Sequence, residues 1–133
     1  MLEVIQGLPP NYNKIIKRFP LVLKTPGVMF CYGEKIYTRA HVTPPLMAHE
    51  MVHAAAQKLT SPEEWWGRYL EDTEFRYEQE LAAHKVEYEW CLKDCNRRDR
   101  RRALNIIAER LASPLYGFPI KKAQAKRFIL AGR

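Results

Sequence analysis

Residues 49 to 53 read His49-Glu50-Met51-Val52-His53, and this string constrains the chain more than any other. On a helix, side chains four positions apart share a face, with about 5–6 Å between their Cβ atoms. Two imidazoles at that spacing can bind one Zn²⁺ at the usual metal–nitrogen distance of roughly 2.0–2.1 Å. Glu50 follows the first histidine directly, so its carboxylate projects beside the metal and can accept a proton from a zinc-bound water. The string therefore predicts two metal ligands and a general base on one helix.

The surrounding sequence favours that helix. Thr43-Pro44-Pro45 suits a helix start, because threonine is a common N-cap and proline fits the first helical positions. The run from 46 to 57 has no glycine or proline and is rich in alanine, leucine and methionine, which are good helix formers. The alternative is a core helix whose histidines only pack. It is disfavoured because burying two histidines and a glutamate without a role costs free energy.

A catalytic zinc needs a third protein ligand and an open position. The long metzincin pattern would place glycine at position 56 and histidine at position 59. The chain has Ala56 and Leu59 instead, so that class is excluded. The third ligand must come from elsewhere in the chain.

A second helix, around 77–88, offers carboxylates. Residues at three- and four-residue steps form a semi-apolar stripe along it: Tyr77, Leu81, His84, Tyr88, Cys91 and Cys95. Glu80 lies at the edge of this stripe and is the predicted third ligand. Glu78 falls on the more polar face and is the alternative ligand. Otherwise Glu78 and Glu87 are expected to be solvated surface charges.

The His-Glu-x-x-His helix, followed some 25 residues later by Glu80-Leu81-Ala82-Ala83, resembles the gluzincins, the thermolysin-like zinc peptidases. The small size, the hairpin ahead of the first helix and Gln57 are similar to minigluzincins, which occur as short bacterial or phage-encoded metallopeptidases. The resemblance covers about residues 27–90. It implies a zincin-like minimal catalytic core, a Zn²⁺ cofactor, and His49, His53 and Glu80 as metal ligands. In that family an aspartate four residues after the glutamate often orients a zinc-bound histidine, and here that position holds His84.

Length and composition predict one domain over residues 1–133, with 47% hydrophobic residues. The chain has no apolar run of about 18 residues or more and no basic region followed by an apolar stretch at its start. We therefore expect a cytoplasmic protein with no transmembrane segment and no signal peptide. Cys91 and Cys95 are expected to be buried free thiols. A second metal site built with Cys31 is the alternative.

The predicted fold class is α+β and mostly helical. Aromatic and β-branched residues on both sides of Gly33-Glu34 predict a β-hairpin over residues 27–39. Ser61-Pro62-Glu63-Glu64 is typical of a helix start. In zincins the strand before the active helix receives substrate by edge pairing, so residues 36–42 are the predicted edge strand. The predicted helices cover residues 10–18, 45–59, 62–71, 73–93, 97–112 and 120–131.

Charge is uneven along the chain. Residues 97–133 hold 11 Lys/Arg and two acids, a net of +9, so the rest holds 22 − 11 = 11 basic and 15 − 2 = 13 acidic residues, a net of −2. Arg97 to Arg102 places five arginines in six positions, a composition that favours nucleic acid or another acidic partner. A solvated helix start explains the tract equally well, although the helix macrodipole disfavours cations there.

Two functions remain open. The first is a zinc-dependent peptidase, acting on a peptide or protein substrate, in which Glu50 activates a zinc-bound water. Tyr77, His84 and Tyr88 are alternative oxyanion stabilisers, and Trp65, Trp66 and Tyr69 are expected to pack the core around the site rather than to form a substrate subsite. The second is a weakly active or inactive zincin-fold protein that uses its basic C-terminal region to bind nucleic acid or a host protein.

Overall fold

The computed structural model describes residues 1–132, and of residue 94 the backbone alone. The chain is mostly helical with one small sheet, consistent with the predicted α+β class. The helices predicted from residue 45 onward lie within two residues of their observed bounds, whereas β1 and the 3₁₀ helix η1 were not predicted. The elements are β1 (Glu3–Ile5), α1 (Tyr12–Arg18), η1 (Pro20–Lys24), β2 (Phe30–Tyr32), β3 (Lys35–Tyr37), α2 (Pro44–Lys58), α3 (Pro62–Glu71), α4 (Thr73–Asp94), α5 (Arg97–Leu111) and α6 (Lys122–Leu130).

The helices that begin at Pro44 and Pro62 start in different ways. Ser61 Oγ accepts a hydrogen bond from the Glu64 amide (3.1 Å), as its sequence predicts. Thr43 occupies the N-cap of α2, but its side chain makes no cap hydrogen bond. Instead, its carbonyl accepts from the Met47 amide (2.8 Å), which is the first hydrogen bond of the helix.

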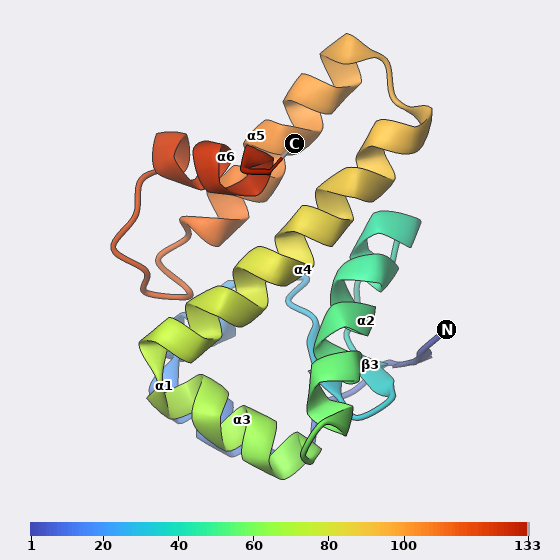
Figure 1. Ribbon diagram of the computed structural model, residues 1–133. Coiled ribbons are helices and arrows are strands. Elements are labelled where there is room, and N and C mark those ends of the chain that lie inside the picture. Colours follow the sequence, from blue (N-terminus) through green and yellow to red (C-terminus); the bar gives the residue numbers. More distant parts are fainter. Residues whose placement is uncertain (133) are drawn as a thin grey trace.

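The long helix α4 organises the molecule. Helix α2, which carries His49 and His53, packs along α4, and α3 joins these two helices (Figure 1). Helix α5 runs back along the far half of α4, and α6 packs against both α4 and α5. The small sheet lies against α2, on the side away from α5. None of the helices within residues 1–132 has the length and apolarity needed to span a membrane.

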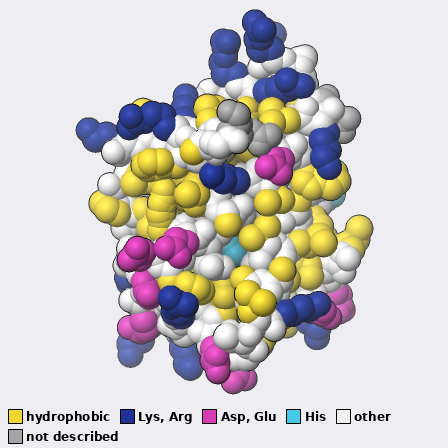
Figure 2. Space-filling model, viewed as in Figure 1, with side chains coloured by type: hydrophobic (Ala, Val, Ile, Leu, Met, Phe, Trp, Pro, Cys, Tyr) yellow, Lys and Arg dark blue, Asp and Glu magenta, His cyan; other side chains and the backbone are white. Residues whose placement is uncertain are grey.

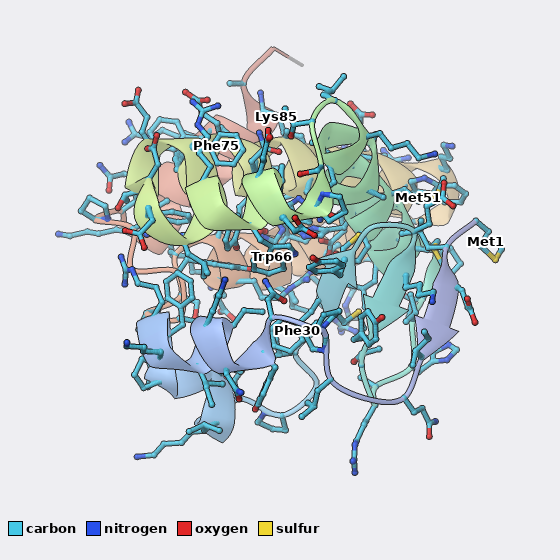
Figure 3. All side chains as sticks on the ribbon, turned by 90° about the horizontal axis from the view of Figure 1, so that it is seen from below. Met1, Phe30, Met51, Trp66, Phe75 and Lys85 are labelled. Carbon is cyan, nitrogen blue, oxygen red and sulfur yellow. The ribbon has the colours of Figure 1, made fainter. Side chains whose placement is uncertain are left out.

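Two apolar clusters lie at opposite ends of α4. The first joins α1, η1, β2 and α3, and Figure 3 shows its members Trp66 and Phe30 between α3 and the N-terminal elements. The second joins the far half of α4 to α5 and α6. The α2–α4 contact lies between the clusters, so both hold the polar side chains of these two helices in place. The buried members are Ile15, Phe19, Val22, Phe30, Trp65, Trp66, Tyr69 and Leu70 in the first cluster, and Tyr88, Ile107, Ala108, Leu111, Phe118, Ala125 and Ile129 in the second.

The predicted edge strand is wrong. The strand order is β1-β3-β2, with β1 parallel and β2 antiparallel to β3, so β3 is the central strand. Residues 38–42 are not in a strand, and the Thr38 amide donates to the Ile5 carbonyl (3.0 Å). The N-terminal strand β1 pairs with the edge of β3 that was expected to be free. Strand β1 has only three residues, too few to show the alternating pattern by which a strand is recognised in a sequence.

The expectation for the cysteines is met only in part. Cys31 is buried, while Cys91 and Cys95 are half-buried, and all three are free thiols. Cys91 lines an open groove between α2 and α5. The semi-apolar stripe of α4 predicted from the sequence is therefore partly exposed to solvent near its C-terminal end.

Gln57 joins the hairpin to α2. Its Oε1 accepts from the Gly33 amide (2.7 Å), and its Nε2 donates to the Cys31 carbonyl (2.8 Å), which also accepts from Trp66 Nε1 (2.9 Å). The side chain is 1% exposed. Gly33 needs glycine here because its φ is +64°. The Cys31 carbonyl of the edge strand β2 is therefore hydrogen-bonded by the side chains of Gln57 and Trp66.

We predict that Gln57→Ala lowers the free energy of unfolding by about 1–3 kcal/mol, because the half-buried Gly33 amide loses its acceptor and the buried Cys31 carbonyl loses a donor. Urea unfolding followed by circular dichroism would measure the change. Lys58→Ala is the control. It removes an exposed ion pair with Glu34, which solvent screens, so the stability should change little. Equal stability of wild type and Gln57→Ala would contradict the role given to this amide.

Candidate metal centre

His49 and His53 lie one turn apart on α2 and face Glu80 of α4. His49 Nε2 is 3.3 Å from Glu80 Oε1, and His53 Nε2 is 3.1 Å from Glu80 Oε2. All three side chains are buried. The centres of the two imidazole rings lie 4.9 Å apart, and the rings are inclined at 81° to each other. The Nε2 atom of each ring faces one oxygen of Glu80. The three side chains can hold a metal ion.

The polar atoms of this cluster fit such an ion. Two ligands at about 2.0–2.1 Å from a tetrahedral metal lie roughly 3.4 Å from each other, close to the two observed separations. Both ring nitrogens of His53 and the Oε1 atom of Glu80 are buried without a hydrogen-bond partner among the described residues. Buried polar atoms in native proteins are rarely left in that state. A cation between the three side chains would satisfy His53 Nε2 and Glu80 Oε1 together.

Tyr69 of α3 holds the Glu80 carboxylate in place beside the two histidines. The Tyr69 hydroxyl donates to Glu80 Oε2 (2.8 Å), which leaves Oε1 open. Burial would raise the pKa of Glu80, but the charges of His53 and His49 hold it well below its usual range. The alternative ligand Glu78 is exposed to solvent. The helical phase of α4 therefore places Glu80, and not Glu78, against the histidines.

The expectation that Glu87 is a surface charge is wrong. Glu87 is 3% exposed, and its Oε1 lies 2.9 Å from His49 Nδ1. Its Oε2 accepts a hydrogen bond from Arg110 of α5. The side chain of Glu87 points between α2 and α5, and only the packing of those two helices on α4 makes this position buried.

The His49–Glu87 hydrogen bond fixes the imidazole for metal binding. With Nδ1 donating its proton to Glu87, Nε2 faces Glu80 and is the nitrogen that could bind a metal in place of its own proton. Burial opposes a charge on His49, but Glu80 and Glu87 raise its pKa to about 10. Burial also opposes the charge of Glu87, yet its contacts with His49 and His84 lower the pKa of Glu87 below its usual range. Glu87 is therefore placed to orient the His49 ring, whereas position 84, where the resemblance implied an orienting aspartate, holds a histidine.

His84 packs behind His49. Its Nδ1 lies 3.3 Å from Glu87 Oε1, and its ring lies 4.6 Å from that of His49. Burial lowers the pKa of His84 to about 4, so it is neutral at pH 7. His49, His84 and Glu87 form a second group with the spacing of a metal site. In that group the Glu87 oxygens are already hydrogen-bonded, so the group with His53 and Glu80 is the better candidate.

Glu50 completes the site on α2. It is 6% exposed, and its Oε2 is buried with no hydrogen-bond partner among the described residues. Burial raises the pKa of its carboxyl above the ordinary value, while His49 and His53 act in the opposite direction. A carboxylate with a free oxygen and a raised pKa is suited to accept a proton and to return it.

Two cavities meet at Glu50 and His49. An open groove of about 610 Å³ runs between the segment before β2 and helix α5. A smaller cavity of about 60 Å³ lies deeper, against the first apolar cluster. Val28, Met29, Leu115 and Tyr116 line both cavities. Glu50 is therefore open to the groove.

The aromatic residues of α3 pack as expected. Trp65, Trp66 and Tyr69 are buried in the first cluster, and Trp65 lies 5.2 Å from the His53 ring. The same three residues also line the deeper cavity, so they both pack the core and form part of the cavity wall.

Of the three oxyanion candidates, only His84 lies at the site. Tyr77 and Tyr88 pack in the second apolar cluster. Tyr116, from the loop after α5, lines both cavities instead. Burial raises the pKa of Tyr116 well above its ordinary value, so its hydroxyl keeps its proton and can donate it in a hydrogen bond.

Arg76 fixes the two tyrosines that approach the site. Its Nη1 donates to the Tyr69 carbonyl (2.7 Å) and its Nε to the Tyr116 carbonyl (3.3 Å). The guanidinium also lies 4.9 Å from the centre of the Phe19 ring. This 1% exposed arginine thus links α3, α4 and the loop after α5. Sequence reasoning missed Arg76, Glu87, Arg110 and Tyr116, and no local spacing signals any of them.

Comparisons of this chain with protein-family models, with curated proteins and with solved structures gave no match.

We predict that the wild-type protein binds one Zn²⁺ per chain and that His49→Ala, His53→Ala and Glu80→Ala each remove it. A zinc site with two protein ligands is incomplete, because such sites use at least three. Metal analysis after dialysis would show this. Glu78→Ala, on the exposed face of α4, is the control and should keep its zinc. Loss of zinc in the control, with retention in Glu80→Ala, would show that the wrong carboxylate was assigned.

We also predict that Glu87→Gln weakens zinc affinity by about 10–100-fold, the usual effect of removing the partner of a metal-binding histidine. Glutamine keeps the shape but removes the negative charge that faces His49 and Arg110. Competition with a chromogenic chelator would give the affinity. Glu89→Gln, at an exposed position of the same helix, changes the net charge equally and is the control. Equal affinities in the two variants would remove the orienting role of Glu87.

Proposed function

We propose that this protein is a zinc-dependent peptidase with a zincin-like minimal catalytic core. The observation that carries the proposal is the position of Glu50. Its buried, unpartnered oxygen lies at the meeting point of the groove and the His49–His53–Glu80 cluster. A metal with a purely structural role has no need of a free carboxylate at its side.

The residues of the site have distinct parts in this proposal. His49, His53 and Glu80 hold the metal, and Glu87 orients His49. When bound, zinc supplies a Lewis acid that polarises the peptide carbonyl and lowers the pKa of water. Glu50 accepts one proton from the attacking water. As the water oxygen bonds to the carbonyl carbon and the C–N bond breaks, Glu50 returns that proton to the leaving amine.

The groove supports an extended peptide as substrate. Its mouth is open to solvent between residues 25–29 and α5, and the walls carry apolar side chains such as Leu46 and Ile106. Since β3 is a central strand, substrate does not add to β3 as first expected. The segment of residues 27–29, which leads into β2 and lines the groove, is the backbone best placed to lie beside a bound peptide.

We predict that Glu50→Gln keeps the fold and the zinc but loses peptide hydrolysis by about 10²–10⁴-fold. Glutamine fills the same space and can hydrogen-bond water, but it cannot take up a proton. The measurement is cleavage of a fluorogenic peptide library, with zinc content determined on the same samples. Met51→Gln, at the exposed neighbouring position, is the control.

Equal cleavage by wild type and Glu50→Gln would contradict the proposed base. No cleavage by zinc-loaded wild type across the library would favour the second function, a zincin-fold binding protein.

A further inference from the structure

The end of the molecule where α4 passes into α5 is strongly basic. Five arginines occupy the first six positions of α5, and all five side chains are exposed. Figure 2 shows Lys and Arg side chains gathered at the top of the molecule, where Figure 1 places the start of α5. The set is Arg97, Arg98, Arg100, Arg101 and Arg102.

The fold does little to neutralise these charges. Arg97, Arg98 and Arg101 make no hydrogen bond or ion pair with other residues in the part of the chain that the structure describes. They also lie in the first turns of a helix, where the macrodipole disfavours cations. The N-cap of the helix is Asn96, whose Oδ1 accepts a hydrogen bond from the Asp99 amide (2.9 Å). The arginine side chains are therefore not needed to begin the helix. An external anion would stabilise this arrangement.

An exposed aromatic ring lies at the same end. Trp90, one turn before the end of α4, is 41% exposed. Lys93 Nζ lies 4.2 Å from the centre of its ring. Arg100 Nη2 donates to the Leu92 carbonyl (3.1 Å), which brings the arginine helix against the last turns of α4. The basic end therefore carries a partly exposed aromatic ring beside its charges.

We propose that this end of the molecule binds single-stranded nucleic acid. The arginines contact the phosphates, and the exposed indole of Trp90 stacks on an unpaired base. Phosphate contacts alone would fit a duplex or an anionic membrane equally well. The tryptophan selects among these partners, because bases in a single strand expose their faces for stacking and those of a duplex do not.

The surface is distinct from the metal centre but close to the groove. Ala103, which directly follows Arg102, and Ile106, about one turn after Arg102, line the groove. A bound strand would lie beside one end of it. The binding itself needs neither zinc nor peptide hydrolysis, so it can be tested whether or not the protein is a peptidase.

The experiment is fluorescence anisotropy of a labelled single-stranded oligonucleotide of about 15 nucleotides, titrated with the full chain at several salt concentrations. One variant carries Arg97→Ser, Arg98→Ser and Arg101→Ser. Its matched control carries Lys14→Ser, Lys17→Ser and Lys24→Ser, which removes the same charge from exposed positions on α1 and η1. Trp90→Ala and Trp90→Phe form a second pair.

Wild type is expected to bind, with an affinity that falls as salt rises. The arginine variant should bind more weakly and lower the log–log salt slope by about 2, since each lost contact with a single strand contributes about 0.7. The lysine variant should keep the slope. Trp90→Ala should weaken binding by about fivefold or more, and Trp90→Phe should restore most of it.

Several results would overturn the proposal. These are no oligonucleotide binding by wild type at low salt, equal losses in the two triple variants, or duplex binding as tight as single-strand binding with no effect of Trp90→Ala. Binding confined to anionic lipid vesicles or to an acidic peptide would assign the arginines to a different partner.

Discussion

The contact of α2 with α4 is the interaction on which the rest of the structure depends. It brings Glu80 between the two histidines of α2 and places Glu87 on the other side of His49. The two apolar clusters lie at the two ends of α4, and the buried polar side chains of α2 and α4 lie between them.

Such a contact is costly without a cation. Carboxylates and imidazoles lose their hydration when buried, and partners left unpaired cost several kcal/mol. Glu87 is compensated by His49, His84 and Arg110, but His53, Glu50 and Glu80 Oε1 are not. The uncompensated atoms belong to or lie beside the His49–His53–Glu80 group, which could hold a metal ion. Metal binding and folding are therefore expected to be linked, because the ligands meet only in the folded chain.

Much of this arrangement can be predicted from the sequence because it follows from helical periodicity. The spacing of His49 and His53, the place of Glu50 beside them and the phase of Glu80 each depend on one helix alone. Glu87 depends on three helices, and its position between α2 and α5 has no local signal. The same reason explains Arg110 and Tyr116, which come from a segment about 30 residues after Glu80. The pairing of β1 with β3 is also long-range, so the central position of β3 could not be predicted from the hairpin.

The most direct measurement of the central claim is anomalous X-ray diffraction at the zinc edge from crystals of the zinc-loaded protein. The account predicts one peak within about 2.0–2.2 Å of His49 Nε2, His53 Nε2 and a Glu80 oxygen, with the fourth position open towards Glu50 and the groove. A peak between His49, His84 and Glu87, or no peak in this part of the molecule, would contradict it.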